Sequence, residues 1–448
     1  MRKTTFWIFT VFFAAAISQI SAAEKMRMTP GDINDLELPS FDEKTGFKEW
    51  EVFGKNVKYV SDDQILIKEA RLDIFSLNDS HKKNATFSSP RATLSRITKS
   101  AKSDAPLFVS GESFKLKGLD WKWSGVKRFV SLSKDVDVEF EGREEEGVKK
   151  IRIKSDYASM DYSGDENKFY FEKNVSVNGD DFSILSERLS TQAPKRSENS
   201  GFKSLNGISA SGRVKMRYQS GISASAESVK VNPESGLANM EGNPEIVNED
   251  TRDSVWGDKI VFKKSDSSAA AYSSADGKAR ARAIIHASAD SPQKGELKPT
   301  AIFADTITMT RGKDSDVFLF AGNVVVENPE FKAFAKRLEA VSKKSEGGRQ
   351  DILKISGFDG VKFLKDGQIA QADKIEIFPR NMEVWLNGGA KLEDPERGVR
   401  LFADRISMLH NDGRATAFSS SPKKPVRLEI DQSDSLGLEA SPRPVAIT

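Results

Sequence analysis

A short phrase of three alternating segments occurs twice between residues 302 and 409, and it limits what this chain can fold into. Apolar and polar residues alternate within the segments, as at Ile375 and Ile377 beside Lys374 and Glu376. Alternation with a period of two predicts β-strands that carry one apolar face. That face has to be covered by another part of the protein or by a ligand. The segments are 302–309, 317–326 and 334–341 in the first copy, and 370–377, 382–390 and 402–409 in the second.

Weaker copies of the phrase precede these two, at 149–162, 168–177 and 182–189. Glycine-centred motifs also recur. Gly212 and Gly242 are about thirty residues apart, and Gly360 and Gly389 are separated by nearly the same interval. A period of this length is typical of a solenoid, or of a long sheet in which each unit packs only on its neighbours.

One segment fits two kinds of secondary structure. Phe331, Phe334, Leu338 and Val341 have the spacing of an amphipathic helix. The same stretch nearly matches residues 402–409, where apolar residues alternate, so we predict a strand.

The residues before the repeats predict a separate all-β domain at 38–145. Short alternating runs are separated there by Gly, Asn, Asp and Pro, which mark turns. Trp121 and Trp123 lie on one face of such a run, and we interpret them as part of the core or as cover for a sheet edge.

The amino terminus has the regions of a secretory signal: basic Arg2 and Lys3, an apolar run, and small residues up to Ala23. We predict a cleaved signal at 1–23 and a mature chain outside the cytoplasm. An inner-membrane anchor is the alternative, because this segment is about long enough to cross a bilayer. The other predicted divisions are a tether at 24–37, β modules at 146–264 and 300–430, a loop or linker at 265–299 with room for one strand at 281–286, and a loose tail at 431–448.

Composition excludes several classes of function. Lysine and arginine total 68 against 66 acidic residues, and Arg2 and Lys3 account for the difference, so no global field attracts nucleic acid. The chain has no cysteine, so no disulfide framework stabilises it. Three scattered histidines, His81, His286 and His410, do not have the spacing of a metal or nucleophilic site. We therefore predict no metal and no cofactor.

Two sets of motifs resemble proteins of one family. The phrase Ala-Asp-x-apolar-x-apolar, followed by a turn and Gly-Asn-Val-x-Val, stands at 304–326 and is echoed at 372–392 and 403–409. It resembles the organic-solvent-tolerance (OstA-like) domain of the periplasmic lipopolysaccharide-transport proteins, of which LptA is one. The segment 38–42, Ser89-Pro90-Arg91-Ala92 and 111–114 resemble LptC, the partner of that family linked to the inner membrane. Members usually have one module per chain, whereas we expect three modules in this chain.

The resemblance implies an all-β fold of elongated, V-shaped antiparallel jelly-roll modules, three in tandem. It also implies an apolar slot for the acyl chains of lipopolysaccharide or a related glycolipid. The implied partners are that lipid, an inner-membrane ABC exporter, outer-membrane translocon components and, through exposed edge strands, a second copy of the chain. The residues expected to line the slot are Ile307, Met309, Leu319, Val324, Val326, Ile375, Ile377, Val384, Leu386, Ile406 and Met408.

Other interpretations stay open. Each residue of the expected slot could equally be an ordinary core residue. Basic side chains at Lys336, Arg337, Arg400 and Arg405 could meet anionic head groups or simply face solvent. The whole chain could be a structural or adaptor solenoid that binds only proteins.

A carbohydrate-active enzyme is the third possibility. Its two catalytic acids would be paired in space and not in sequence, so the sequence does not exclude it. Asp305, Asp373 and Asp404 recur at one place in the repeat, which strand-entry geometry explains better than catalysis.

Overall fold

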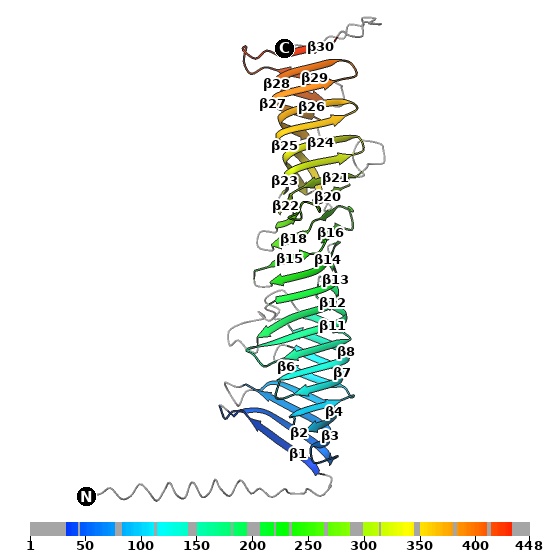
Figure 1. Cartoon of the computed structure of the whole chain (residues 1–448), viewed down its shortest axis with the longest axis vertical. Helices are drawn as coiled ribbons and strands as arrows, with labels where there is room; N and C mark the ends of the chain where they lie inside the picture. The colour runs from blue at the N-terminus through cyan, green and yellow to red at the C-terminus, as the bar shows by residue number, and fades with distance from the viewer. Residues whose placement is uncertain are drawn as a thin grey trace, which may run out of the picture. The chain divides into compact units, whose positions relative to one another are not determined.

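The computed structural model describes residues 33–43, 45–76, 83–111, 114–141, 150–180, 182–194, 207–218, 221–232, 235–263, 268–286, 299–312, 315–344, 350–379, 383–409 and 414–431. Within these ranges the regular structure consists of strands, and every printed register between them is antiparallel (Figure 1). The all-β, antiparallel fold class is therefore confirmed. No helix in these ranges is long and apolar enough to cross a membrane, and the predicted signal peptide lies outside them.

The chain forms two compact units. Unit 1 contains Met1–Gly111 and Leu119–Val130, and unit 2 contains Glu112–Gly118 and Ser131–Thr448. Two strands, β7 (Phe114–Ser124) and β8 (Phe129–Glu141), contribute residues to both. Unit 1 thus ends before residue 145, the expected boundary of the first domain.

Unit 1 is an antiparallel sheet with a tryptophan-rich core. Trp50 and Trp123 meet edge to face with ring centroids 5.5 Å apart, and both are buried. Trp121 is also buried, so the interpretation of Trp121 and Trp123 as core residues is confirmed. Besides parts of β7 and β8, the strands are β1 (Ile33–Phe41), β2 (Lys48–Tyr59), β3 (Gln64–Phe75), β4 (Lys83–Ser95), β5 (Ser100–Ser103) and β6 (Leu107–Gly111).

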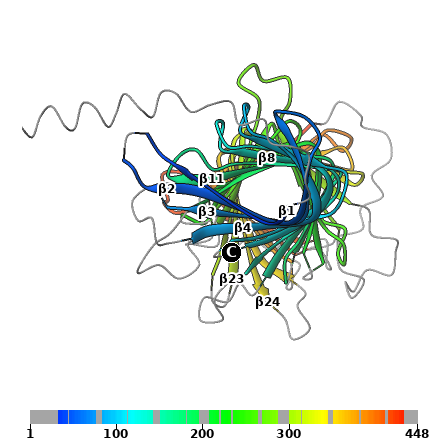
Figure 2. The ribbon, with the colours of Figure 1, turned by 90° about the horizontal axis from the view of Figure 1, so that it is seen from below.

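Unit 2 stacks strands that pair with near neighbours in the sequence. Figure 2 shows these strands curving round instead of forming a flat sheet. They are β9 (Lys150–Ser155), β10 (Tyr157–Asp161), β11 (Glu166–Asn178), β12 (Phe182–Pro194), β13 (Gly207–Tyr218), β14 (Ile222–Asn232), β15 (Leu237–Glu241), β16 (Glu245–Asn248), β17 (Ser254–Trp256), β18 (Lys259–Lys263), β19 (Ser268–Tyr272), β20 (Ala281–Ile285), β21 (Thr300–Ala304), β22 (Thr306–Arg311), β23 (Ser315–Asn328), β24 (Phe331–Lys344), β25 (Gln350–Lys365), β26 (Gln368–Phe378), β27 (Glu383–Asp394), β28 (Val399–Leu409), β29 (Arg414–Phe418) and β30 (Arg427–Ile430).

A corner divides each long strand path of unit 2 into two arms. The register shifts there, for example between Ala321 and Val324 where β23 pairs with β24, and between Gln371 and Lys374 where β26 pairs with β27. Extra residues that interrupt a ladder bend the strand and increase its twist. The repeated bends give each module the two arms of the expected V shape.

Two segments contain strands where a tether and a linker were expected, and a third resolves the choice between helix and strand. β1 begins at Ile33, inside the segment expected to be an unstructured tether. The expected linker contains β19 and β20, the second of which matches the strand allowed for at 281–286. β24 covers the segment with ambiguous periodicity, so the strand prediction is confirmed. Its helical spacing does not mark one face, because Phe331 and Leu338 lie on one face of the sheet and Phe334 and Val341 on the other.

Candidate functional site

One continuous row of buried side chains runs along the first arm of unit 2. Each member is the register partner of the next, so the row crosses the sheet perpendicular to the strands. Its residues, here called the inner row, are Ala158, Phe171, Leu189, Ala210, Val229, Met240, Ile260, Ala271, Ile307, Phe320, Leu338, Gly357, Ile375, Leu386, Ile406 and Ala417. The row contains no charged residue, and all its members except Ala417 are buried.

A second row lies two residues further from the corner, on the same face. Its members, here called the rim row, are Met160, Phe169, Thr191, Ile208, Val231, Ala238, Phe262, Ala269, Met309, Phe318, Ala340, Ile355, Ile377, Val384, Met408 and Ala415.

Burial divides the rim row into a sealed part and an open part. Met160, Phe169 and Thr191 are buried, whereas from Ile208 onward nearly every member is half-buried, and Phe262 is 40% exposed. Half-exposed apolar side chains in a continuous strip are typical of a binding surface. The open strip therefore begins at β13 and extends to β28.

Phenylalanine side chains fill the interior at the other end of unit 2. Phe169 meets Phe114 and Phe140 edge to face at centroid distances of 5.1 and 5.3 Å, and it stacks on Phe171 at 6.5 Å. All four are at most 3% exposed. Rings in this arrangement pack to the density of a protein core. The interior from β7 to β11 is therefore occupied by the chain itself.

The corners are built by an acidic residue on one strand and two left-handed residues on the next. The backbone N–H of Asp305 donates to the carbonyl oxygens of Ala321 and Gly322, both at 3.0 Å, and Asn323 Nδ2 donates to Asp305 Oδ2 at 3.0 Å. Gly322 and Asn323 have φ angles of 78° and 47°. This arrangement supports the interpretation of Asp305 as a strand-entry residue.

The same geometry recurs at other corners. Asn174 Nδ2 donates to Asp156 Oδ2 at 2.7 Å, and Asp373 lies against Gly388 as Asp305 lies against Gly322. At Asp404, the hydroxyl and backbone N–H of Ser420 donate to Oδ2 and hold the pKa of that carboxyl below its ordinary value. These carboxylates are engaged in shaping the sheet.

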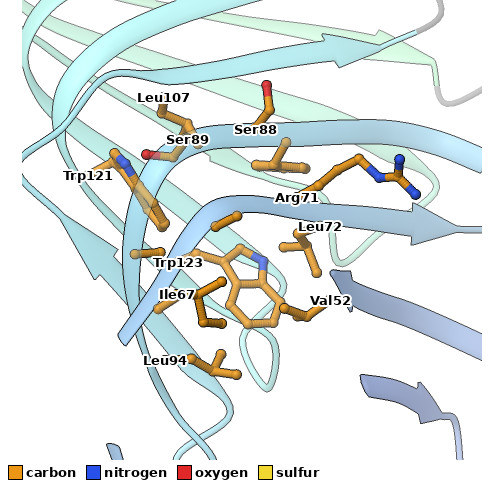
Figure 3. A pocket seen from close by; sticks show the side chains of 14 residues that line it. Val52, Ile67, Arg71, Leu72, Ser88, Ser89, Leu94, Leu107, Trp121 and Trp123 are labelled. Carbon is orange, nitrogen blue, oxygen red and sulfur yellow. The ribbon is translucent and has the colours of Figure 1, made fainter. Parts of the chain in front are cut away.

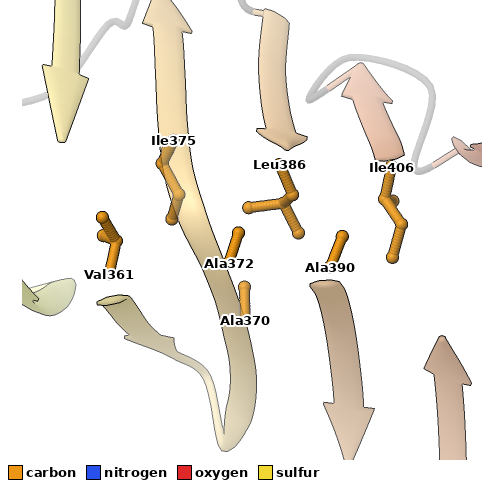
Figure 4. Close-up of a cluster of buried hydrophobic side chains, with 7 residues drawn as sticks. All are labelled: Val361, Ala370, Ala372, Ile375, Leu386, Ala390 and Ile406. Atoms are coloured by element: carbon orange, nitrogen blue, oxygen red, sulfur yellow. The ribbon is translucent and has the colours of Figure 1, made fainter. Parts of the chain in front are cut away.

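Ten of the eleven residues expected to line a slot lie on the inner face of unit 2. Ile307, Ile375, Leu386 and Ile406 belong to the inner row. Met309, Ile377, Val384 and Met408 belong to the rim row, and Val324 and Val326 are buried on the second arm. Figure 4 shows Ile375, Leu386 and Ile406 projecting from adjacent strands into one buried cluster. Ile377, Val384 and Met408 pack against that cluster and are half-buried.

Leu319 is the exception, because it points to the opposite face. It pairs with Thr308 and Glu339, whereas its neighbours Phe318 and Phe320 pair with Met309 and Ile307 and occupy the two rows. Four consecutive apolar residues at 317–320 hide the alternation in the sequence. The sequence analysis therefore missed Phe318 and Phe320, and the register identifies them.

The basic residues considered for head-group contact are not on the inner face. The Arg337 guanidinium stacks 4.2 Å above the Phe358 ring, and that of Arg405 lies 3.5 Å above Trp385. Arg400 is close to Glu393 and Glu429 on the outer face. Lys336 is exposed at a corner.

Metal-binding groups do not gather in the part of the chain that the structure describes, where no cluster of three His, Asp or Glu side chains could hold an ion. His286 lies 3.7 Å from Asp253, measured from Nδ1 to Oδ1. His81 and His410 are outside the described residues.

Unit 1 encloses a small apolar cavity in its core. Its apolar cavity has a volume of about 30 Å³ and is lined by Ile67, Leu72, Leu94, Trp121 and other core residues (Figure 3). A cavity of this size has room for only a water molecule or two. Lipid chains would not fit there.

These features define a repetitive antiparallel β protein with an apolar inner face that is partly open in its second unit. Residues 152–267 match the family model described as LptA/(LptD N-terminal domain) LPS transport protein. Residues 152–267 are therefore similar to this family of lipopolysaccharide transport proteins, which confirms the resemblance seen in the sequence. The matched range lies within unit 2, so the likeness of residues 38–145 to LptC stays a prediction.

Two further comparisons add little. A search of curated proteins returns no match. Among solved structures, the chain is similar to LptH, the LptA homologous periplasmic component of the lipopolysaccharide transport device from Pseudomonas aeruginosa. The identity is 14%, and the match covers 30% of this chain and 96% of LptH. Its TM-score of 0.23 is too low to support a conclusion.

Proposed function

We propose that this protein is a periplasmic, non-enzymatic carrier that helps move lipopolysaccharide or a related glycolipid between the inner and outer membranes. The observation that carries the proposal is the half-open part of the rim row, from Ile208 to Met408, which contains only apolar side chains. The matched transport family supports the same substrate class.

The energy of binding would come from apolar area alone. Burial contributes about 0.8 kcal/mol per methylene, so an acyl chain of about a dozen carbons gains on the order of 10 kcal/mol before ordering costs. Because successive rim-row positions are chemically alike, a chain can shift from one strand to the next without breaking any specific bond. The phenylalanine-filled end is where such movement would stop.

The ends of the sheet suggest how the carrier meets its partners. Among the described residues, β1 pairs only with β2, and β29 and β30 pair only with β28, which leaves edges available for strand addition. A second copy of this chain, or the exporter and translocon components at the two membranes, would add strands there.

Photo-crosslinking tests the carrier directly. A benzophenone amino acid placed at Val384 or Met408 lies on the rim row, whereas at Trp385 or Ser407 it faces outward on the same strands. With purified lipopolysaccharide, we expect labelling at 384 and 408 and little at 385 and 407. Equal labelling of the two faces, or none at 384 and 408, would reject the carrier and leave a structural or adaptor protein.

A further inference from the structure

A polar pocket of about 270 Å³ lies in unit 1, separate from its tryptophan-lined core cavity. It occupies the region where β4 stops pairing with β5 and pairs with β6 instead. Its walls are Leu66 on β3, Arg91, Ala92 and Thr93 on β4, Lys102, Ser103 and Asp104 at the end of β5, and Asp120, Trp121 and Lys122 on β7.

Two lysines on one wall form an unfavourable pair. Lys102 and Lys122 are direct register partners in the β5–β7 ladder, and both are exposed. Neither makes an ion pair with a carboxylate of the described chain. Like charges directly opposite each other on a sheet are destabilising. An anion between the two ammonium groups would remove this repulsion.

The carboxylates of the pocket do not neutralise the two lysines. Asp104 is held by Arg91 through Nε–Oδ1 and Nη2–Oδ2 contacts of 3.2 and 2.9 Å, so its charge is already balanced. Asp120 remains on the wall and weakens the positive field. Leu66, Ala92 and Trp121 supply the apolar part of the lining.

We propose that this pocket binds a phosphate group, as free phosphate or as a phosphate monoester, with the phosphate between Lys102 and Lys122 and the group attached to a monoester against the apolar lining. A phosphate monoester carries close to two negative charges at pH 7, which matches two ammonium groups. The source could be free phosphate or the phosphorylated sugar of a lipid head group. The pocket belongs to unit 1, so the proposal does not depend on lipid binding along the rim row of unit 2.

Calorimetric titration of the full chain tests the site with three probes: inorganic phosphate, glucose 1-phosphate and glucose. Lys102→Gln and Lys122→Gln should each weaken phosphate binding about tenfold, the usual loss for a hydrogen bond to a charged group. Lys127→Gln removes the same charge from an exposed turn of unit 1 and should change affinity less than about twofold. Tighter binding of glucose 1-phosphate would indicate a sugar-phosphate ligand, and equal binding would indicate free phosphate.

Three results would overturn the proposal: no binding of either phosphate probe, binding that K102Q and K122Q leave unchanged, or an equal loss in K127Q. Melting temperatures of the three variants establish that each is folded. Rim-row crosslinking should be the same in K102Q as in the parent protein, which separates this test from that of the carrier.

Discussion

At the corners of unit 2, single residues decide where the sheet bends. The recurring Ala-Asp-x-apolar phrase is the sequence form of this bend: Ala304 and Ile307 both face inward, although two residues lie between them instead of one. Asp305 stands between them and bonds to the next strand. The break in the alternation of apolar and polar residues therefore marks the position of the bend.

Glycine substitutions distinguish two requirements of a corner, a left-handed backbone and space for the neighbouring carboxylate. A Cβ on Gly322 would lie 2.2 Å from Asp305 Oδ2, and its φ is 78°, whereas Gly360 has a φ of 82° with open space around it. We expect Gly360→Ala to cost about 1–2 kcal/mol from backbone strain alone. Gly322→Ala should cost more, about 3 kcal/mol, because the carboxylate must also move. Urea unfolding measures both.

Gly164 provides the control, because it has no neighbour within 4 Å and no left-handed φ. Gly164→Ala should change stability by less than about 0.5 kcal/mol. Equal losses in G322A and G360A would show that contact with Asp305 is unimportant.

Glu376 gives unit 2 a stability that depends on pH. Lys354 and Lys374 contact its carboxylate at 2.6 and 2.8 Å and lower the pKa of Glu376 below its ordinary value of 4.5. Because the folded pKa is depressed, the stabilisation is present above the unfolded pKa and is lost as the pH falls through the folded pKa. Between about pH 6 and pH 3, the parent protein should lose more stability than Glu376→Gln.

Melting temperature against pH measures this difference. Glu330→Gln, in the exposed turn between β23 and β24, serves as the matched control and should follow the parent curve. A parent curve that coincides with that of E376Q would contradict the assigned role of the two lysines.

At the scale of strands, the two rows have different tasks. The inner row holds adjacent strands together, because its side chains are buried on both sides by their register partners. The rim row is only half covered by the chain, which leaves area for a ligand. Two neighbouring positions on β27 allow the rows to be compared directly.

Leu386 belongs to the inner row and is 0% exposed, and Val384 belongs to the half-open rim row. Leu386→Ala should destabilise the protein by about 2–5 kcal/mol, because it leaves a cavity in the packed cluster. Val384→Ala should cost about 1 kcal/mol or less, since part of its surface is already in water. Urea unfolding of the two variants would contradict this division if the losses were equal.

For the whole molecule, the edges of the sheet control self-association by strand addition. β30 carries Leu428 and Ile430, which are 47% and 60% exposed, and within the described ranges this strand pairs only with β28. We expect the protein to self-associate as its concentration rises, and Leu428→Lys with Ile430→Lys to suppress this, because charged edges oppose strand addition. Sedimentation velocity over a range of concentrations measures the effect.

Val126→Lys is the control, since Val126 is 72% exposed and lies in a turn of unit 1 rather than in a strand. The same loss of association in V126K would indicate general charge repulsion. A parent protein that stays monomeric throughout would remove self-association from the proposed function.

The sequence predicted the all-β class, the repeats and the inward orientation of ten of the eleven candidate slot residues, because alternation and turn residues are local properties of a strand. It did not determine the face of Leu319, since four apolar residues in succession carry no period and only pairing with β22 and β24 assigns them. It also did not reveal that phenylalanines fill one end of unit 2 while the rim row opens from Ile208 onward. Burial depends on side chains brought together from distant strands, so the fold as a whole sets which part of the apolar face is core and which part stays half-exposed.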